Sequence, residues 1–466
     1  MVVDRLRTDL LNKLINARID LAAYLQLRKA KGYMSVSESD TLRDNFFELN
    51  RELHDHALRQ GLHLDQEEWN ALRRAEGALA AAAVCLMSGH HDCPTFIAVN
   101  ADKLENCLTT LTLSIQSLKA HSPLTKAGWL AALIPEEFGG SGLGLTEASI
   151  IMEEINRSGG NSGACHGQMY NMNTLLRHGS DKQKEFWLPR IATGEWRLQS
   201  MGVTEPTAGT DTTRIKTTAV KREDRYVING QKVWISRVQH SDWMILLVRT
   251  TPLANVKRKS EGMSIFMVDI KEAMKNGMTV RPIPNMVNHE TNELFFDNLE
   301  IPEENLIGEE GMGFHYILDG LNAERTLIAA ECIGDGYWFM DRVTRYTCER
   351  EVFGRPIGQN QGVQFPIAEA FIAVEAANLM RFKACELFDQ HLDCGAQANM
   401  AKYLAAKASW EAANACLQFH GGYGFACEYD IERKFRETRL YQVAPISTNL
   451  ILSYIAEHVL EMPRSF

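Results

Sequence analysis

Several features are missing from this 466-residue sequence. It has no charge-free run of about 18 apolar residues, so it predicts no transmembrane helix. Its charged, amphipathic N-terminus lacks the apolar core and small-residue cleavage site of a secretory signal. Basic residues are outnumbered, 49 against 59 acidic, for a net charge of −10. That balance argues against a general nucleic-acid binder, although a local patch could still hold a phosphate-bearing cofactor.

Paired cysteines are also missing. None of the ten cysteines forms a CxxC pair, so neither a zinc ribbon nor a thioredoxin-type site is predicted. Scattered cysteines favour reduced thiols in a cytoplasmic protein. The segment His90-His91-Asp92-Cys93 could be read as a set of metal ligands, but a polar loop is the commoner fate of such a run. A hydrophobic share of 45% and a charged share of 23% are typical of soluble globular chains.

The residue pattern changes twice along the chain and so divides it into three parts. The length likewise suggests about three domains. Residues 1–126 have helical spacing throughout and predict an antiparallel bundle of four helices. We expect these helices over residues 6–25, from Ser35 or Ser37 onward, over 65–87 and over 100–120. Residues 145–157 predict a further helix, with Thr146 as its N-cap and Gly159 as its stop.

Strand patterns dominate from about residue 203 to 296. Residues 225–228 and 231–235 flank Asn229-Gly230, which predicts a β-hairpin with an Asn-Gly turn. Further strands are expected at 244–248, 264–268 and 294–296, and helices return after about residue 309. Helices, strands and helices in separate blocks indicate an α+β fold. No Gly-x-Gly-x-x-Gly follows a strand, so a Rossmann site is not predicted.

Four motifs stand out in the last three quarters of the chain. They are VTEPTAGTD at 203–211, NGQKVWIS at 229–236, CEREVFGRP at 348–356 and LQFHGGYGF at 417–425. In their order and separation they resemble the flavin-dependent acyl-CoA dehydrogenase family. The resemblance implies a truncated version of that fold. It consists of a partial N-terminal helical domain over 127–200, a β-domain over 201–300 and a C-terminal four-helix bundle over 301–466.

The resemblance implies FAD as the cofactor. The hydroxyls and backbone N–H groups of the first motif suit an acceptor-rich ligand, and Trp234 and Ser236 share one strand face at period two. The alternative for Trp234 is burial in the core, which is more common for a tryptophan in a strand. The guanidinium of Arg350 suits a pyrophosphate and, by resemblance, reaches the flavin of a neighbouring subunit. The implied FAD contacts are Met201, Val203, Thr204, Gly209, Thr210, Trp234, Ser236, Arg350, Phe353, Gln361, Gln418, Gly421, Gly422, Ser447 and Asn449.

The implied reaction is α,β-dehydrogenation of an acyl-CoA thioester to the trans-2-enoyl-CoA, which needs a carboxylate base for the α-proton. Most of the family carries this glutamate near the C-terminus, where this chain has Pro445. The isovaleryl and long-chain branch carries it before an arginine on a helix, which corresponds to Glu324, with Arg325 and Thr210 as substrate contacts. A solvated helix-face carboxylate is the alternative for Glu324. Glu331 and Asp335 match no catalytic position.

The resemblance to the dehydrogenases also implies partners. They are an electron-transfer flavoprotein as electron acceptor and further copies of the chain in a homodimer or homotetramer, with neither nucleic-acid binding nor membrane insertion. Residues 1–126 resemble the biofilm-formation regulator BssR, so the rival hypothesis is a biofilm-related regulatory or interaction protein with an inactive dehydrogenase module. A flavin-dependent nitro- or amine-oxidising relative on the same fold is a third hypothesis. Glu205, inside the first motif, is expected to stabilise its loop.

Overall fold

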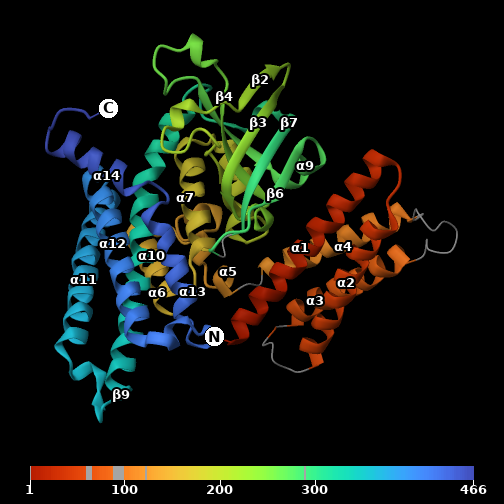
Figure 1. Ribbon diagram of the computed structural model, residues 1–466. Coiled ribbons are helices and arrows are strands. Elements are labelled where there is room, and N and C mark those ends of the chain that lie inside the picture. Colours follow the sequence, from red (N-terminus) through yellow and green to blue (C-terminus); the bar gives the residue numbers. More distant parts are fainter. Residues whose placement is uncertain are drawn as a thin grey trace. The chain divides into compact units, whose positions relative to one another are not determined.

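The computed structural model describes residues 2–58, 64, 66–87, 99–120, 123–287 and 290–465 (Figure 1). The segment His90-His91-Asp92-Cys93 lies outside these residues. The chain divides into two compact units. Unit 1 comprises Met1–Ala127 and Thr193–Arg197, and unit 2 comprises Gly128–Ala192 and Leu198–Phe466.

Unit 1 is a helical bundle with its own apolar core. The expected helices are present as α1 (Val2–Lys31), α2 (Val36–Leu58), α3 (Gln66–Met87) and α4 (Ala101–Ala120), followed by the short α5 (Pro123–Lys126). Leucines and alanines of all four long helices form one buried cluster. Ser35 caps α2, since its hydroxyl accepts from the backbone N–H of Glu38 at 3.2 Å and Glu38 accepts from the Ser35 N–H at 3.0 Å.

Unit 2 begins with α6 (Leu145–Arg157), α7 (Gly163–His178) and α8 (Asp181–Ala192). The predicted bounds of α6 are confirmed, and Gly159 follows its end with φ of 90°. The prediction of Thr146 as N-cap is wrong. Gly144 is the N-cap, and its N–H donates to the Glu147 carboxylate at 3.0 Å. The Thr146 hydroxyl instead donates to Asp389 at 2.6 Å.

The centre of unit 2 is an eight-stranded sheet in the order β6-β7-β3-β2-β4-β5-β8, with β1 paired to β4. Helix α9 (Ile270–Lys275) lies between β5 and β6 in the chain. The strands are β1 (Leu198–Gly202), β2 (Thr218–Arg222), β3 (Arg225–Ser236), β4 (Trp243–Arg249), β5 (Met263–Asp269), β6 (Met278–Pro282), β7 (Thr291–Pro302) and β8 (Leu306–Ile307).

The predicted hairpin at Asn229-Gly230 is wrong. β3 runs straight through these residues, and the turn falls at residues 223–224, between β2 and β3. Gly230 lies at a register shift of β3 against β7 with φ of 149°, where an added Cβ would come within 2.6 Å of the Thr217 Cα. The glycine therefore serves a bulge and a close backbone approach, not a turn.

Helices fill the rest of unit 2: α10 (Gly313–Glu349), α11 (Gln361–Asp389), α12 (Gly395–His420), α13 (Ile431–Arg439) and α14 (Thr448–Tyr454). The short strands β9 (Glu351–Val352) and β10 (Arg355–Pro356) pair between α10 and α11. This block of helices after the sheet confirms the predicted α+β layout. Among the described helices, only α11 is long and apolar enough to cross a membrane, judged by length and composition alone.

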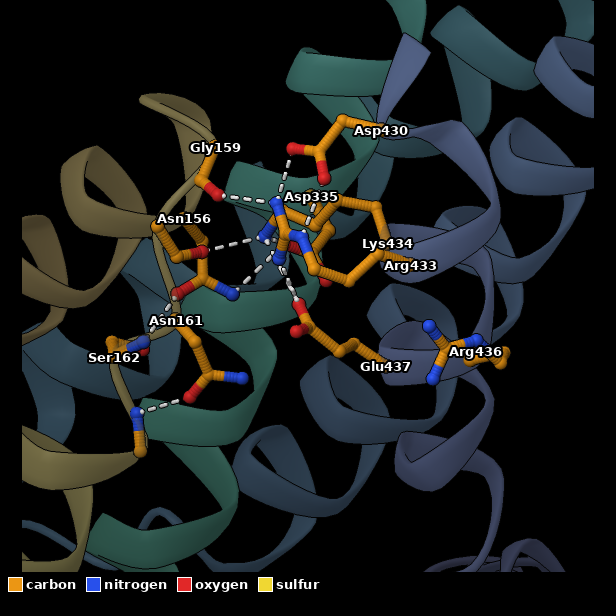
Figure 2. A network of polar contacts seen from close by, with 12 residues as sticks. Asn156, Gly159, Asn161, Ser162, Asp335, Asp430, Arg433, Lys434, Arg436 and Glu437 are labelled. Carbon is orange, nitrogen blue, oxygen red and sulfur yellow. Dashed lines mark hydrogen bonds and ion pairs between the residues drawn. The ribbon is translucent and has the colours of Figure 1, made fainter. Parts of the chain in front are cut away.

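A buried polar network joins α6, α10 and α13 (Figure 2). Lys434 on α13 pairs with Asp335 on α10 and donates to the Gly160 carbonyl at 2.7 Å. The Asn156 amide donates to the same Asp335 oxygen at 2.9 Å. Both charged side chains are fully buried. The network fixes α10, the helix that carries Glu324, against its neighbours.

Candidate active site

Glu324 lies in the first half of α10 and is partly buried. Burial raises the pKa of its carboxyl group above the usual value, while His166, Arg325 and Lys402 act to lower it. Three groups that are cationic when protonated therefore surround this carboxylate, one each from α7, α10 and α12. Burial favours the protonated form and the cations favour the ionised form, so the carboxyl group can hold a proton or release it. The alternative, that Glu324 is an ordinary solvated glutamate on a helix face, does not fit this partly buried position.

Lys402 on α12 interacts both with Glu324 and with the segment that follows Pro445. The Lys402 side chain is fully buried on α12, and its ammonium donates to the Ile446 carbonyl at 2.7 Å. Ile446 directly follows Pro445. Burial lowers the pKa of Lys402 to about 8. Lys402 thus acts electrostatically on the Glu324 carboxyl group and holds the residue that follows Pro445. Of Glu324 and Pro445, only Glu324 has a side chain that can accept a proton.

Arg325 lies beside Glu324 and is partly buried. It donates to the Asn322 side chain at 3.0 Å, and burial lowers the pKa of its guanidinium. Two further electrostatic neighbours of Arg325 are Tyr454 on α14 and Cys394 before α12. Arg325 therefore lies where α14 meets α10 and α12. Ser447 caps α14, its hydroxyl accepting from the Leu450 N–H at 3.4 Å, and Asn449 is exposed nearby.

Two other carboxylates of α10 are engaged in ion pairs. Glu331 is buried and lies 3.2 Å from the Nδ1 of His166 on α7. Burial acts to lower the pKa of His166, but Glu331 and Glu324 together outweigh burial, and the net shift of the pKa is upward. The His166 ring also meets the Tyr170 ring edge-on at 5.0 Å. Asp335 pairs with Lys434. Glu331 and Asp335 are thus each paired with a residue on a neighbouring helix.

The β-domain holds one group of the residues predicted to contact the flavin. The Thr204 carbonyl accepts from the Val233 N–H at 2.9 Å, and the Ser200 hydroxyl donates to the Ser236 carbonyl at 2.6 Å, so the first two motifs lie side by side. Trp234 is 60% exposed, with φ of 63°, at a bulge of β3. The alternative of a core Trp is therefore wrong for Trp234, and its indole is displayed on the surface of the sheet.

A buried pair stabilises this motif. Glu205 accepts from the backbone N–H groups of Lys216 and Thr217 at 2.6 and 2.9 Å, and it lies 2.9 Å from the Lys232 ammonium. Lys232 also donates to the Val203 carbonyl at 2.9 Å. The loop-stabilising role predicted for Glu205 is confirmed. The remaining residues of this group are the partly buried Met201 and the exposed Gly209 and Thr210.

The second group of predicted flavin contacts lies at the far end of α10. Arg350 is the exposed C-cap of α10, and its guanidinium is 6.0 Å from the Tyr423 ring in the 3₁₀ segment Gly421–Phe425. Phe353 is fully exposed at the tip of the β9–β10 hairpin. The other members are exposed at the adjoining helix ends: Gln361, Gln418, Gly421 and Gly422. A Cβ added to either glycine would meet no described atom within 4 Å, so backbone is open to a ligand there.

The two groups lie on different elements of unit 2, one on the β-domain and the other around the C-terminal end of α10. Figure 1 shows β9 at the opposite end of α10 from the sheet. Helix α10 has 37 residues, which corresponds to a length of about 55 Å. The donor chemistry of both groups fits a dinucleotide: an exposed indole and hydroxyls in one, and a guanidinium, amides and open glycine backbone in the other.

Sequence reasoning missed the polar residues that surround Glu324. His166, Tyr170 and Lys402 come from α7 and α12, and no motif marks them. Lys402 lies in an alanine-rich helical run, AKYLAAKAS, which also contains Lys407, and a lysine in such a run is expected to be solvated. Only the packing of α12 against α10 and α14 turns it inward.

Comparisons with known proteins agree with this geometry. Three family descriptions match from residue 116 onward: "Acyl-CoA dehydrogenase, N-terminal domain" at 116–195, "middle domain" at 200–299 and "C-terminal domain" at 311–460. Residues 1–126 match "Biofilm formation protein (YliH/bssR)".

Individual relatives likewise match either the N-terminal segment or the remainder of the chain. The biofilm regulator BssR of Escherichia coli (strain K12) is 78% identical over 127 residues, which are 27% of this chain and 100% of that protein. Acyl-CoA dehydrogenase fadE12 of Mycobacterium bovis is 35% identical over 351 residues, which are 73% of this chain and 87% of that protein. The structure of a glutaryl-coenzyme A dehydrogenase in complex with glutaryl-CoA matches with a TM-score of 0.68 and 32% identity, covering 74% of this chain and 87% of that one. The chain therefore belongs to the acyl-CoA dehydrogenase family, with a segment of the BssR biofilm formation family over residues 1–126.

Proposed function

We propose that unit 2 is an FAD-dependent acyl-CoA dehydrogenase in which Glu324 removes the α-proton of an acyl-CoA thioester. The observation that carries this proposal is that Lys402 lowers the pKa of Glu324 and also donates a hydrogen bond to the Ile446 carbonyl, next to Pro445. Of the two places where the family positions its base, this chain has a carboxylate at one and a proline at the other. The raised pKa of Glu324 suits a group that must gain a proton and later release it.

The residues of the two flavin groups are the proposed FAD contacts. Trp234 and Ser236, with Val203 and Thr204, would hold one part of the cofactor against the β-domain. Arg350 and Gln418, with the glycines after α12, would hold the other. When bound, FAD supplies the hydride acceptor for the β-carbon of the substrate. The product is the trans-2-enoyl-CoA.

Around the substrate, each polar side chain has a separate task. Glu324 takes the proton from the α-carbon. Lys402 and Arg325 favour the ionised carboxylate before the reaction, because both lower the pKa of Glu324. Lys402 also fixes the segment before α14 through the Ile446 carbonyl. The region of Ser447 and Asn449 then has a defined position relative to Glu324.

The decisive experiment replaces Glu324 with glutamine, which is nearly isosteric but cannot act as the base. Glu324→Gln should fold, bind FAD and bind acyl-CoA as the wild type does. Anaerobic bleaching of the flavin by a panel of acyl-CoAs, followed by stopped flow, should slow by about 10²–10⁴-fold. The matched control is Glu411→Gln, an exposed carboxylate on α12, which should bleach at the wild-type rate.

Wild-type bleaching in Glu324→Gln would show that another residue is the base. A double variant, Glu324→Gly with Pro445→Glu, tests the position directly. It moves the carboxylate to the other place around Lys402 and should recover part of the lost rate. A wild-type protein that holds FAD but is bleached by no acyl-CoA would favour the inactive, regulatory alternative.

Assembly is part of the proposal. We propose that each flavin site is built from the first group of one copy and the second group of another, in a homodimer or homotetramer, and that an electron-transfer flavoprotein is the electron acceptor. Arg350→Ala and Trp234→Ala chains, each purified alone, should both retain FAD poorly. Mixed assemblies of the two variants should regain FAD in half of their sites, because one site per pair is then intact. No recovery in verified mixed assemblies would mean that each site is built within one chain.

A further inference from the structure

A hollow with an unusual charge lies on unit 2, away from the proposed catalytic residues. Its volume is about 190 Å³, and we call it the arginine hollow. It is lined by Arg157, Ser158, Trp338, Asp341, Arg342 and Arg345. Arg157 is the last residue of α6 and Ser158 is its C-cap. The other four residues follow the i, i+3, i+4, i+7 spacing of a single helix face on α10.

The walls of the hollow are well defined. Trp338 is buried and forms the floor, and an added Cβ on Gly159 would lie 2.9 Å from its indole nitrogen. The Arg342 guanidinium lies 5.1 Å from the Trp338 ring centroid. The Arg157 guanidinium lies 4.9 Å from the Tyr337 ring centroid. Two of the three arginines are thus held against aromatic rings, which limits their freedom before any ligand arrives.

The charge of the three arginines is not balanced by ion pairs. Within the described part of the chain, none of them forms an ion pair or a hydrogen bond through its guanidinium. Other arginines of unit 2 do: Arg381 pairs with Glu153, and Arg433 pairs with Asp430. With Asp341 counted, the lining carries a formal charge of +2 in a chain whose net charge is −10. Like charges gathered in one hollow repel each other unless an anion joins them.

We propose that the arginine hollow binds a phosphate dianion, free or as a phosphate monoester. The guanidinium fork matches two phosphate oxygens at once, and phosphate carries a charge near −2 at neutral pH. The hollow, of about 190 Å³, has room for a phosphate group. A phosphate dianion therefore fits the site in charge and can enter it.

The hollow is distant from the proposed base but lies near the second flavin group, since Arg345 precedes Arg350 by five residues, about 8 Å along the helix axis. Arg342 follows Glu324 by 18 residues on the same helix, which places it about 27 Å away along the axis. None of the lining residues belongs to the two flavin groups. The inference does not depend on the proposed function, because binding can be measured without any substrate turnover.

The test uses the full-length, FAD-loaded protein and inorganic phosphate as the probe. Isothermal titration calorimetry in a chloride buffer of constant ionic strength should give one phosphate per chain. Arg342→Gln and Arg345→Gln should each weaken binding by about tenfold or more, since each removes a charge-assisted contact. Arg222→Gln, which removes an exposed arginine on β2, is the matched control and should bind as the wild type does. Trp338→Phe should abolish any change of tryptophan fluorescence that phosphate causes.

Two further arms identify the source of the phosphate. Coenzyme A and dephospho-coenzyme A differ by one phosphate monoester. If coenzyme A displaces phosphate from the hollow and dephospho-coenzyme A does not, the occupant is that monoester. If neither displaces it, the occupant is free phosphate. Wild-type protein that binds no phosphate, or arginine variants that bind it unchanged while their melting temperatures stay at the wild-type value, would overturn the proposal.

Discussion

Replacing Lys434 by methionine should destabilise unit 2 strongly. The lysine and Asp335 are fully buried, and the pair lies between α10 and α13 (Figure 2). Methionine keeps most of the side-chain volume but removes the cation and the bond to the Gly160 carbonyl. The Asp335 carboxylate then keeps the Asn156 amide as a donor but has lost its countercharge. Removing one partner of a buried pair costs about 3–5 kcal/mol.

The size of the expected melting shift follows from the size of the unit. Unit 2 holds about 330 residues, and an unfolding entropy of about 2.1 cal/mol/K per residue gives about 0.7 kcal/mol/K for the unit. A loss of about 3–5 kcal/mol then lowers the melting temperature by roughly 4–7 °C. Calorimetry of the full chain measures this shift, because the two units can be told apart by comparison with residues 1–126 alone.

Two controls make the result specific. Lys383→Met breaks an exposed pair with Glu386 on α11, 2.8 Å apart, and should change the unfolding free energy by no more than about 1 kcal/mol. The double variant Lys434→Met with Asp335→Leu should recover most of the loss, because no uncompensated charge remains. A single variant that melts within the range of the exposed control would refute the reasoning, as would a double variant as unstable as the single one.

Two more predictions concern Lys402 and unit 1. Burial lowers the pKa of Lys402 to about 8 from 10.5, so between those values the unfolded chain holds a proton that the folded chain has lost. The contribution of Lys402 to stability should therefore rise with pH in that window, by up to about 1.4 kcal/mol per pH unit. Urea unfolding of the wild type and Lys402→Met at both ends of the window measures it, and a constant difference would contradict it. Residues 1–126 expressed alone should melt cooperatively by circular dichroism, since their helices share one core. A signal without a transition would show dependence on unit 2.

The sequence predicted helices better than turns, and the reason is physical. Amphipathic spacing over a dozen residues is a repeated signal, and it located α6 to the residue. The Asn229-Gly230 turn rested on two residues. Long-range packing of β3 against β7 and against Thr217 decided the role of Gly230, and no local pattern records that packing. Local turn chemistry was overridden by the pairing of the whole strand.

The candidate site shows the same division. Motif residues such as Trp234 and Arg350 could be named from the sequence, because they sit in runs with a recognisable order. Lys402 and His166 could not, since each acts only through a neighbour distant in the chain. The positions of Trp234 and Arg350 relative to each other could also be known only from the structure, because the sequence does not show that α10 is one continuous helix.

The covalent link between the two units has a consequence for stoichiometry. A regulator-like unit and an enzyme unit made as one polypeptide are always synthesised in equal numbers, and neither can be induced without the other. An assembly built from several copies of unit 2 also displays the same number of copies of unit 1. Any partner that binds unit 1 would then meet a multivalent surface, and its apparent affinity would depend on how many dehydrogenase units have assembled.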